Sequence, residues 1–254
     1  MKHRRRLVIT LVVLSLLGAV VLQAQRARQG ARFNPFLGVF TNTPPETEFV
    51  MARWHYTAGW GGGGWSHDYP TAEEHILQIM KEVTGINVER LSYRVVELSS
   101  PEIFEYPFAY VSEPGEMLLT EQEVVNLREY ISRGGFVMID DFGGQGQGPV
   151  EFETFRDNLI RAFPDRDMFV LRDDHSILNT FYEIDSIQTV HPMSGVKSVF
   201  YGYPGEKDEL SMIVCYANDV GDYWEWSAEG LYGNAPTNDA YRLGVNYLVY
   251  EMTH

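Results

Sequence analysis

Cysteine and basic residues are scarce in this sequence. Cys215 is the single cysteine among 254 residues, so no intramolecular disulfide can form, and its apolar neighbours predict that it is buried in a strand. The 20 Lys and Arg are outnumbered by 35 Asp and Glu, which gives a net charge of −15. Because nucleic acids and anionic membrane faces are bound through Lys and Arg, we expect this chain to bind neither.

Familiar catalytic and phosphate-binding motifs are also absent. The chain has no Gly-x-Ser-x-Gly turn of the kind that presents a serine nucleophile. Its glycine run at 61–64 is not followed by Lys and Ser or Thr, so it is not a P-loop. No pair of histidines has the close spacing of a zinc-binding helix.

The N-terminus has the pattern of an export signal. Four basic residues within 2–6 precede an apolar stretch at 7–22, which is shorter than the ~20 residues that span a membrane. We expect residues 1–24 to be a cleaved signal peptide, because Ala24 offers a cleavage site, and the protein to be periplasmic or extracellular. The alternative is an uncleaved anchor that attaches the protein to the inner membrane through residues 7–22, its only expected membrane contact.

Beyond a linker-like stretch at 25–46, residues 47–254 are expected to form a single α/β domain. Apolar strand-like runs alternate with helical patterns, and Thr120 with Glu123 makes a capping box at the start of the clearest helix. The strands are expected at 49–56, 108–111, 136–139, 168–171, 199–203 and 211–217, and the helices at 71–84, 120–133, 152–163 and 239–252. This alternation predicts three layers, with helices flanking a mostly parallel sheet.

The segment at 60–70 places four glycines between two tryptophans and follows them with Ser, His, Asp, Tyr and Pro. Four consecutive glycines lose much conformational freedom on folding, which predicts a close approach to a ligand or a lid. The candidate ligand-binding residues are Trp60, Gly62, Gly63, Trp65, His67, Asp68 and Tyr69. Aromatic faces beside carboxylates suit sugar rings, and Tyr223, Trp224 and Trp226 form a second such group. The alternative is that these aromatic side chains pack in the core.

Acidic residues and a histidine follow three of the expected strands. Because ligands of parallel sheets bind outside the carboxyl ends of the strands, these residues are expected at one edge. The candidates for acid–base or metal-assisted catalysis are Asp68, Asp140, Asp141 and His175. Asp68, Asp141 and His175 are also the candidate ligands of a divalent metal, the one cofactor that the sequence suggests. Alternatively, Asp68 caps the helix at 71–84 and His175 forms hydrogen bonds within its own loop.

Several short motifs together resemble a known family. They lie at 65–70, 106–108, 127–130, 134–136, 139–141, 174–175 and 243–247. In this combination the chain resembles domain-of-unknown-function family 4159 over roughly residues 47–253. The resemblance implies a flavodoxin-like fold close to the class I glutamine amidotransferase-like and trehalose-utilisation proteins. It also implies a bacterial protein, often exported or attached to a membrane. It implies no activity, because none is established for that family.

Amidotransferase chemistry requires a cysteine on a sharp turn between a strand and a helix. Here the strand at 136–139 ends in Asp140 and Asp141, and Cys215 has no flanking glycines, so a cysteine or serine nucleophile is not expected. We therefore predict a non-catalytic exported module that binds a polar, carbohydrate-like ligand or a partner protein of the cell envelope. The alternative is a metal-assisted hydrolase built on the Asp and His candidates.

Overall fold

The computed structural model of the chain describes residues 31–34, 39–59, 63–142, 148–206 and 209–254. The chain divides into two compact units, Met1–Thr43 and Pro44–His254. In the first unit, β1 (Ala31–Asn34) and β2 (Val39–Asn42) form an antiparallel pair within the stretch predicted as a linker. The predicted signal segment 1–24 lies outside the described residues. Among the helices that are described, none is long and apolar enough to cross a membrane.

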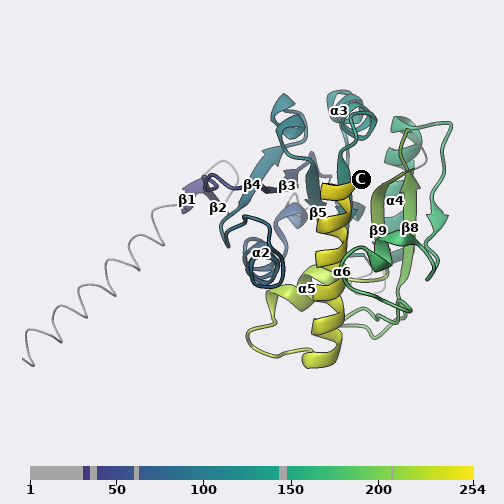
Figure 1. Cartoon of the computed structure of the whole chain (residues 1–254). Coiled ribbons are helices and arrows are strands. Elements are labelled where there is room, and N and C mark those ends of the chain that lie inside the picture. The colour runs from purple at the N-terminus through teal and green to yellow at the C-terminus, as the bar shows by residue number, and fades with distance from the viewer. Residues whose placement is uncertain (1–30, 35–38, 60–62, 143–147, 207–208) are drawn as a thin grey trace, which may run out of the picture. The chain divides into compact units, whose positions relative to one another are not determined.

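The second unit is built on a mostly parallel sheet, as predicted (Figure 1). Within the described residues the sheet has seven strands in the order β4-β3-β5-β6-β9-β8-β7. Their bounds are β3 Met51–His55, β4 Tyr93–Glu97, β5 Phe108–Val111, β6 Phe136–Ile139, β7 Phe169–Val170, β8 Val199–Pro204 and β9 Leu210–Tyr216. The first five strands in spatial order are parallel, whereas β8 is antiparallel to both β9 and β7.

The five parallel strands have the order of a doubly wound sheet. Taken along the chain as β3, β4, β5, β6 and β9, they lie in space as second, first, third, fourth and fifth, which is the flavodoxin-like order. The chain therefore reverses its direction of winding between β3 and β5. In such sheets the ligand crevice opens outside the carboxyl ends of the strands at that reversal. The loops that follow β3 and β5 are the first place to look for a site.

Helices pack on both faces of this sheet. On one face, α2 (Thr71–Val83), α5 (Val220–Glu225) and α6 (Asn234–Thr253) contact one another, and α6 crosses in front of the strands in Figure 1. They cover an apolar cluster to which alternate residues of the central strands contribute, such as Phe108 and Tyr110 of β5. On the other face lie α3 (Glu121–Ser132) and α4 (Gly148–Ala162). There Trp54 of β3 meets Tyr130 of α3 edge to face, with ring centroids 4.9 Å apart.

Local signals in the sequence place most of these elements correctly. The capping box is present: the Thr120 hydroxyl accepts from the Glu123 amide, and the Glu123 carboxylate accepts from the Thr120 amide. Cys215 is buried in β9, as predicted. Helices α4 and α6 begin several residues earlier than predicted, because Pro149 and Pro236 each fall in a first turn, where proline is tolerated. The sequence analysis missed β4, and it also missed the six-residue α5.

Candidate metal centre

Strained backbone is concentrated at the carboxyl edge of the sheet. Among the described residues, four that are not glycine have a positive φ: Asp68 (62°), Glu113 (49°), Asp141 (67°) and Ala217 (52°). They lie in the loops that follow β3, β5, β6 and β9, respectively. A left-handed conformation costs a residue with a side chain about 1–2 kcal/mol, and such strain gathers at functional sites. The backbone itself therefore marks this edge as a candidate site.

Six carboxylates meet at this edge and are called the acidic cluster below: Asp68, Glu113, Asp141, Asp219, Asp222 and Glu225. They form overlapping sets of three groups whose potential ligand atoms lie within 4.8 Å of one another. The sets are Asp68–Asp141–Asp219, Asp68–Asp222–Glu225 and His67–Glu113–Asp141. Asp68 and Asp141 each belong to two sets. Residues from four loops that are distant in the sequence are thus brought together.

A buried arginine positions the loop that carries Asp68. Arg53 of β3 is fully buried and donates from Nε to Oε1 of Glu73 at 2.6 Å. Its Nη1 donates to the backbone carbonyls of Trp65 and His67, both at 3.1 Å. The guanidinium also lies over the ring of Tyr110, 4.1 Å from its centroid, where a cation–π contact forms. Arg53 therefore holds the turn at 65–68 in place through two of its backbone carbonyls.

Asp140 is next to Asp141 in the sequence but belongs to none of the three sets. Its Oδ2 accepts from the Tyr110 hydroxyl at 3.0 Å and from the Gly221 amide at 2.8 Å, which attaches α5 to the end of β6. A side chain at Gly221 would place Cβ 2.3 Å from the Tyr110 hydroxyl and 2.5 Å from Oδ2 of Asp68. Only glycine fits here. Burial raises the pKa of Asp140 to about 6, although the amides of Val220 and Gly221 act in the opposite direction.

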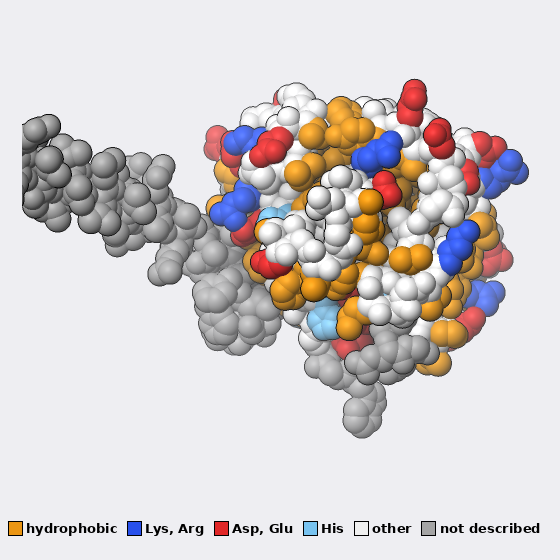
Figure 2. Space-filling model, turned by 90° about the horizontal axis from the view of Figure 1, so that it is seen from below, with side chains coloured by type: hydrophobic (Ala, Val, Ile, Leu, Met, Phe, Trp, Pro, Cys, Tyr) orange, Lys and Arg blue, Asp and Glu red, His pale blue; other side chains and the backbone are white. Residues whose placement is uncertain are grey.

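The electrostatics of the acidic cluster are unfavourable in the absence of a cation. Burial, and then the charges of neighbouring carboxylates, raise the pKa values of Asp68 and Asp219 well above the usual range. Oδ2 of Asp68 is buried and has no hydrogen-bond partner. On the face in Figure 2, several Lys and Arg side chains lie beside Asp and Glu side chains, whereas the six carboxylates of the cluster lie together. The cluster is therefore a local excess of negative charge.

His67 is the nearest positive charge at the surface of the cluster. Its Nδ1 lies 3.1 Å from Oε1 of Glu113 and 3.4 Å from Oδ2 of Asp141, and its side chain is 55% exposed. Hydrogen bonds to Asp141 and Glu113 raise the pKa of His67 to about 10, so the ring is an imidazolium at neutral pH. Ser112 donates a further hydrogen bond to Asp141 at 3.0 Å. Asp141 is thus held from two sides.

The structure does not bring His175 to this cluster. Its Nδ1 accepts from the Ile177 amide at 3.2 Å, and its ring lies beside those of Phe169 and Tyr250. This is the local hydrogen bonding that the sequence analysis gave as the alternative. His67, which was predicted as a ligand-binding residue, occupies the place that His175 was expected to fill. The four catalytic candidates therefore do not converge as one group.

The predicted aromatic platform is largely buried. Trp65 is 2% exposed and meets His55 edge to face, with ring centroids 4.6 Å apart. Tyr69 packs in the same way against Tyr93, at 5.7 Å. Gly63 is exposed, whereas Trp60 and Gly62 lie outside the described residues. Packing, the alternative in the sequence analysis, is thus the role of both described aromatic side chains.

In the second aromatic group, Tyr223 and Trp224 are buried and Trp226 is 40% exposed. The Trp226 side chain donates toward Asp222 and Glu225 and lowers their pKa values, against a larger effect of burial. Trp226 is therefore the aromatic side chain of the group that lies beside the acidic cluster with an accessible face.

Four members of the acidic cluster were missed by the sequence analysis: Glu113, Asp219, Asp222 and Glu225. All of them follow predicted strands, so the rule that selected Asp68 and Asp141 also applies to them. Asp219, Asp222 and Glu225 repeat at every third position, which places them along one side of α5. Arg53 also gave a signal, since a charged residue interrupts an otherwise apolar strand.

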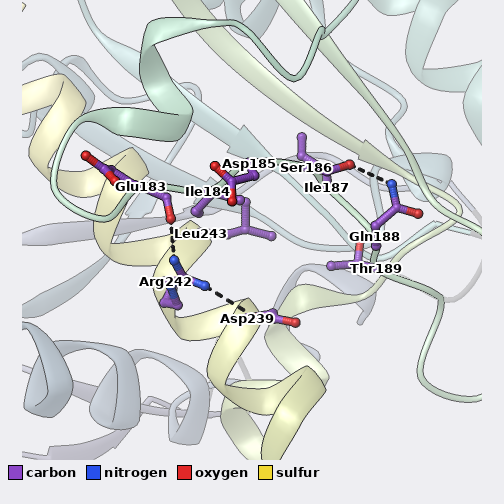
Figure 3. A pocket seen from close by; sticks show the side chains of 10 residues that line it. All are labelled: Glu183, Ile184, Asp185, Ser186, Ile187, Gln188, Thr189, Asp239, Arg242 and Leu243. Atoms are coloured by element: carbon purple, nitrogen blue, oxygen red, sulfur yellow. Dashed lines mark hydrogen bonds and ion pairs between the residues drawn. The ribbon is translucent and has the colours of Figure 1, made fainter.

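A separate cavity lies away from these residues. It has a volume of about 270 Å³ and is formed by the segment 183–189 and by Asp239, Arg242 and Leu243 of α6 (Figure 3). Arg242 reaches from α6 to the backbone carbonyl of Glu183 and lies 3.8 Å from the Asp239 carboxylate. The guanidinium of Arg242, which lines this cavity, is therefore already bonded to other groups of the protein. No member of the acidic cluster lines it.

The fold and the cluster together define a doubly wound α/β protein with a carboxylate-rich site at the carboxyl edge of its sheet. The family model for a domain of unknown function (DUF4159) matches residues 50–252, so the chain belongs to this family. A search of curated proteins finds no match. The description of the family assigns it no activity. The resemblance of the fold to that of class I glutamine amidotransferases stays a prediction.

Proposed function

We propose that this protein binds a divalent cation between Asp68, Asp141 and Asp219 and, through that cation, a polar ligand. The observation that carries the proposal is the buried Oδ2 of Asp68, which has no hydrogen-bond partner and lies among other carboxylates. A buried carboxylate without a partner is costly, and a cation supplies what is missing. The strained backbone at Asp68 and Asp141 supports the proposal further.

The donor set favours a hard cation. Carboxylate oxygens are the preferred ligands of Mg²⁺, Mn²⁺ and Ca²⁺, whereas structural zinc sites are built from cysteine and histidine. Among the described residues, the three sets offer six carboxylates and one imidazole, that of His67. We therefore propose Ca²⁺, Mg²⁺ or Mn²⁺ as the physiological ion.

Charge favours a neutral ligand. If all six carboxylates were ionised and His67 protonated, the formal charge would be −5, and one divalent cation would leave −3. A phosphate would be repelled, whereas the hydroxyl oxygens of a carbohydrate can complete the coordination of the ion at no cost in charge. The accessible face of Trp226 beside Asp222 supplies an apolar surface for a sugar ring. The proposed function is thus cation-dependent binding of a polyol or carbohydrate by an exported protein.

Metal-assisted hydrolysis is a second candidate, and the position of His67 favours it. A bound cation would activate water, and the half-exposed imidazolium of His67 beside Asp141 is placed to donate a proton as a general acid. In this version His67 replaces His175 among the catalytic candidates. Asp140 would position other groups rather than react, since both Tyr110 and Gly221 engage it.

Calorimetry and thermal unfolding test the cation. Protein stripped with EDTA is titrated with Ca²⁺, Mg²⁺ and Mn²⁺, and we expect binding heat and a higher Tm for at least one of them. The Asp141→Asn variant should lose most of both effects. The matched control is Asp174→Asn, because Asp174 is exposed and paired with Arg172 far from the cluster. No heat and no Tm change with any of the three ions would refute the proposal.

A further inference from the structure

We propose that the acidic cluster holds two divalent cations that share Asp68. An inner cation lies between Asp68, Asp141 and Asp219, and an outer cation lies between Asp68, Asp222 and Glu225. This inference rests on the proposed function, which requires only the inner cation. It adds a second metal site and assigns its ligands.

The geometry of the two sets fits two ions. In each set three ligand atoms lie within 4.8 Å of one another. Two oxygens bound to one cation at 2.1–2.4 Å are at most about 4.8 Å apart, and every pair of ligand atoms within each set meets this limit. A carboxylate has two oxygens and can bridge two ions about 3.5–4 Å apart, as in known two-metal centres. Asp68 is the residue common to both sets.

The ligands of the outer cation are held in place before it binds. Asp222 and Glu225 are three residues apart on α5, so they share one side of the helix. The Tyr232 hydroxyl donates to Oδ2 of Asp222 at 2.6 Å, which orients that carboxylate. The same helix begins at Asp219, whose Oδ1 accepts from the Asp222 amide at 2.9 Å. One short helix therefore supplies ligands to both cations.

An independent observation points to missing positive charge at the shared residue. Oδ2 of Asp68 is buried, lacks a partner, and lies close to the backbone of Gly221. Among the described residues, Arg53 is the basic side chain whose charge acts on Asp68; its Nε bonds to Glu73, and its buried Nη2 has no hydrogen-bond partner. The third set is different, because Nδ1 of His67 lies between Glu113 and Asp141 and fills that gap. The two sets that share Asp68 contain no such histidine, and they are the sets that we assign to cations.

Counting bound Mn²⁺ tests the inference. Free Mn²⁺ gives a sharp paramagnetic resonance signal, so titration of the EDTA-stripped protein yields the number of ions bound per chain. We expect two ions for the native protein, with a spectrum broadened by coupling between them. The Glu225→Gln variant should bind one ion tightly and weaken the other by about tenfold or more, since it removes one charged ligand. The control is Glu229→Gln, an exposed residue beyond the end of α5, which should retain two ions.

The outcomes separate this inference from the proposed function. One ion per chain in the native protein would overturn the two-cation centre and leave the proposed function standing. No bound ion would overturn both. Two ions in Glu225→Gln with unchanged affinities would show that the outer site has been misassigned. Thermal unfolding in EDTA checks that Glu225→Gln is folded, and Asp222→Asn provides a second variant if it is not.

Discussion

Replacing Asp219 with asparagine should stabilise the cation-free protein and weaken its binding of cations. Oδ1 of Asp219 caps α5 by accepting from the Asp222 amide, and asparagine is an equally good cap. The substitution therefore keeps the local structure and removes only a charge. Burial and the charges of Asp141 and Asp68 raise the pKa of Asp219 well above its usual range, which means that ionisation of this residue opposes folding.

The size of the effect follows from the distances. Two unit charges 4.8 Å apart repel by about 3.5 kcal/mol at an effective dielectric constant of 20. Partial protonation of the cluster reduces this, so we expect Asp219→Asn to gain about 1–3 kcal/mol, or a rise in Tm of about 3–8 °C. A carboxyl group whose pKa is higher in the folded than in the unfolded protein lowers the free energy of unfolding. This loss begins once the pH exceeds the pKa of the unfolded state, and it grows until the pH reaches the pKa of the folded state. The advantage of the variant should therefore be larger at pH 8 than at pH 5.

Thermal unfolding in two buffers is the assay. In EDTA the variant should melt above the native protein. With cation at about 1,000 times Kd the order should reverse, because binding stabilises the native protein by about 4.1 kcal/mol and the variant by much less. Asp157→Asn, an exposed charge on α4, should change neither melting temperature appreciably. A lower Tm for Asp219→Asn in EDTA would mean that this carboxylate has an attractive partner, and the argument from repulsion would be wrong.

Three further predictions concern packing and protonation. Trp65→Ala should lower the free energy of unfolding by about 3–5 kcal/mol, and Trp226→Ala by much less, as urea denaturation would show; equal losses would contradict the packing role of Trp65. Arg53→Met should lower the free energy of unfolding by about 3–5 kcal/mol, because Glu73 is left buried and unpaired. Adding Glu73→Gln should recover part of that loss, and additive effects of the two substitutions would rule out coupling between the residues. Burial raises the pKa of Glu251 to about 7, so its ionisation opposes folding as the pH rises from about 4.5 to 7. Glu251→Gln should therefore stabilise by about 1–2 kcal/mol at pH 8, allowing for its partial exposure, and not at pH 4.5; a difference independent of pH would refute this.

Local chemistry made much of the fold predictable. The strands at 108–111 and 136–139 are continuous apolar runs and were predicted with their observed bounds, and the capping box located the start of α3. By contrast, β4 lies at an edge of the sheet, and Arg94 and Glu97 interrupt its apolar residues, so it lacks such a run. A six-residue helix such as α5 is too short to show a periodic pattern.

The site was predicted in part, because its residues depend on the order of the strands. Asp68 and Asp141 follow strands that lie near the middle of the sheet, and they meet as expected. His175 was selected by the same rule, but β7 is the far edge strand, separated from β6 by β9 and β8. Asp219 also follows a predicted strand, but the sequence does not indicate that β9 lies directly beside β6, and the segment after this strand was not selected. Local patterns indicate where strands end, and tertiary pairing decides which ends are neighbours.

The position of β9 has a consequence for how the chain acquires its structure. This strand begins at residue 210 and yet lies inside the sheet, between β6 and β8. While the ribosome is still extending the chain, β6 lacks this neighbour and presents an unpaired edge, the kind of template on which chains aggregate. Closing the sheet then requires contacts between segments more than 70 residues apart, which slows folding. A nascent chain of this protein should therefore depend on chaperones until its last quarter has been synthesised.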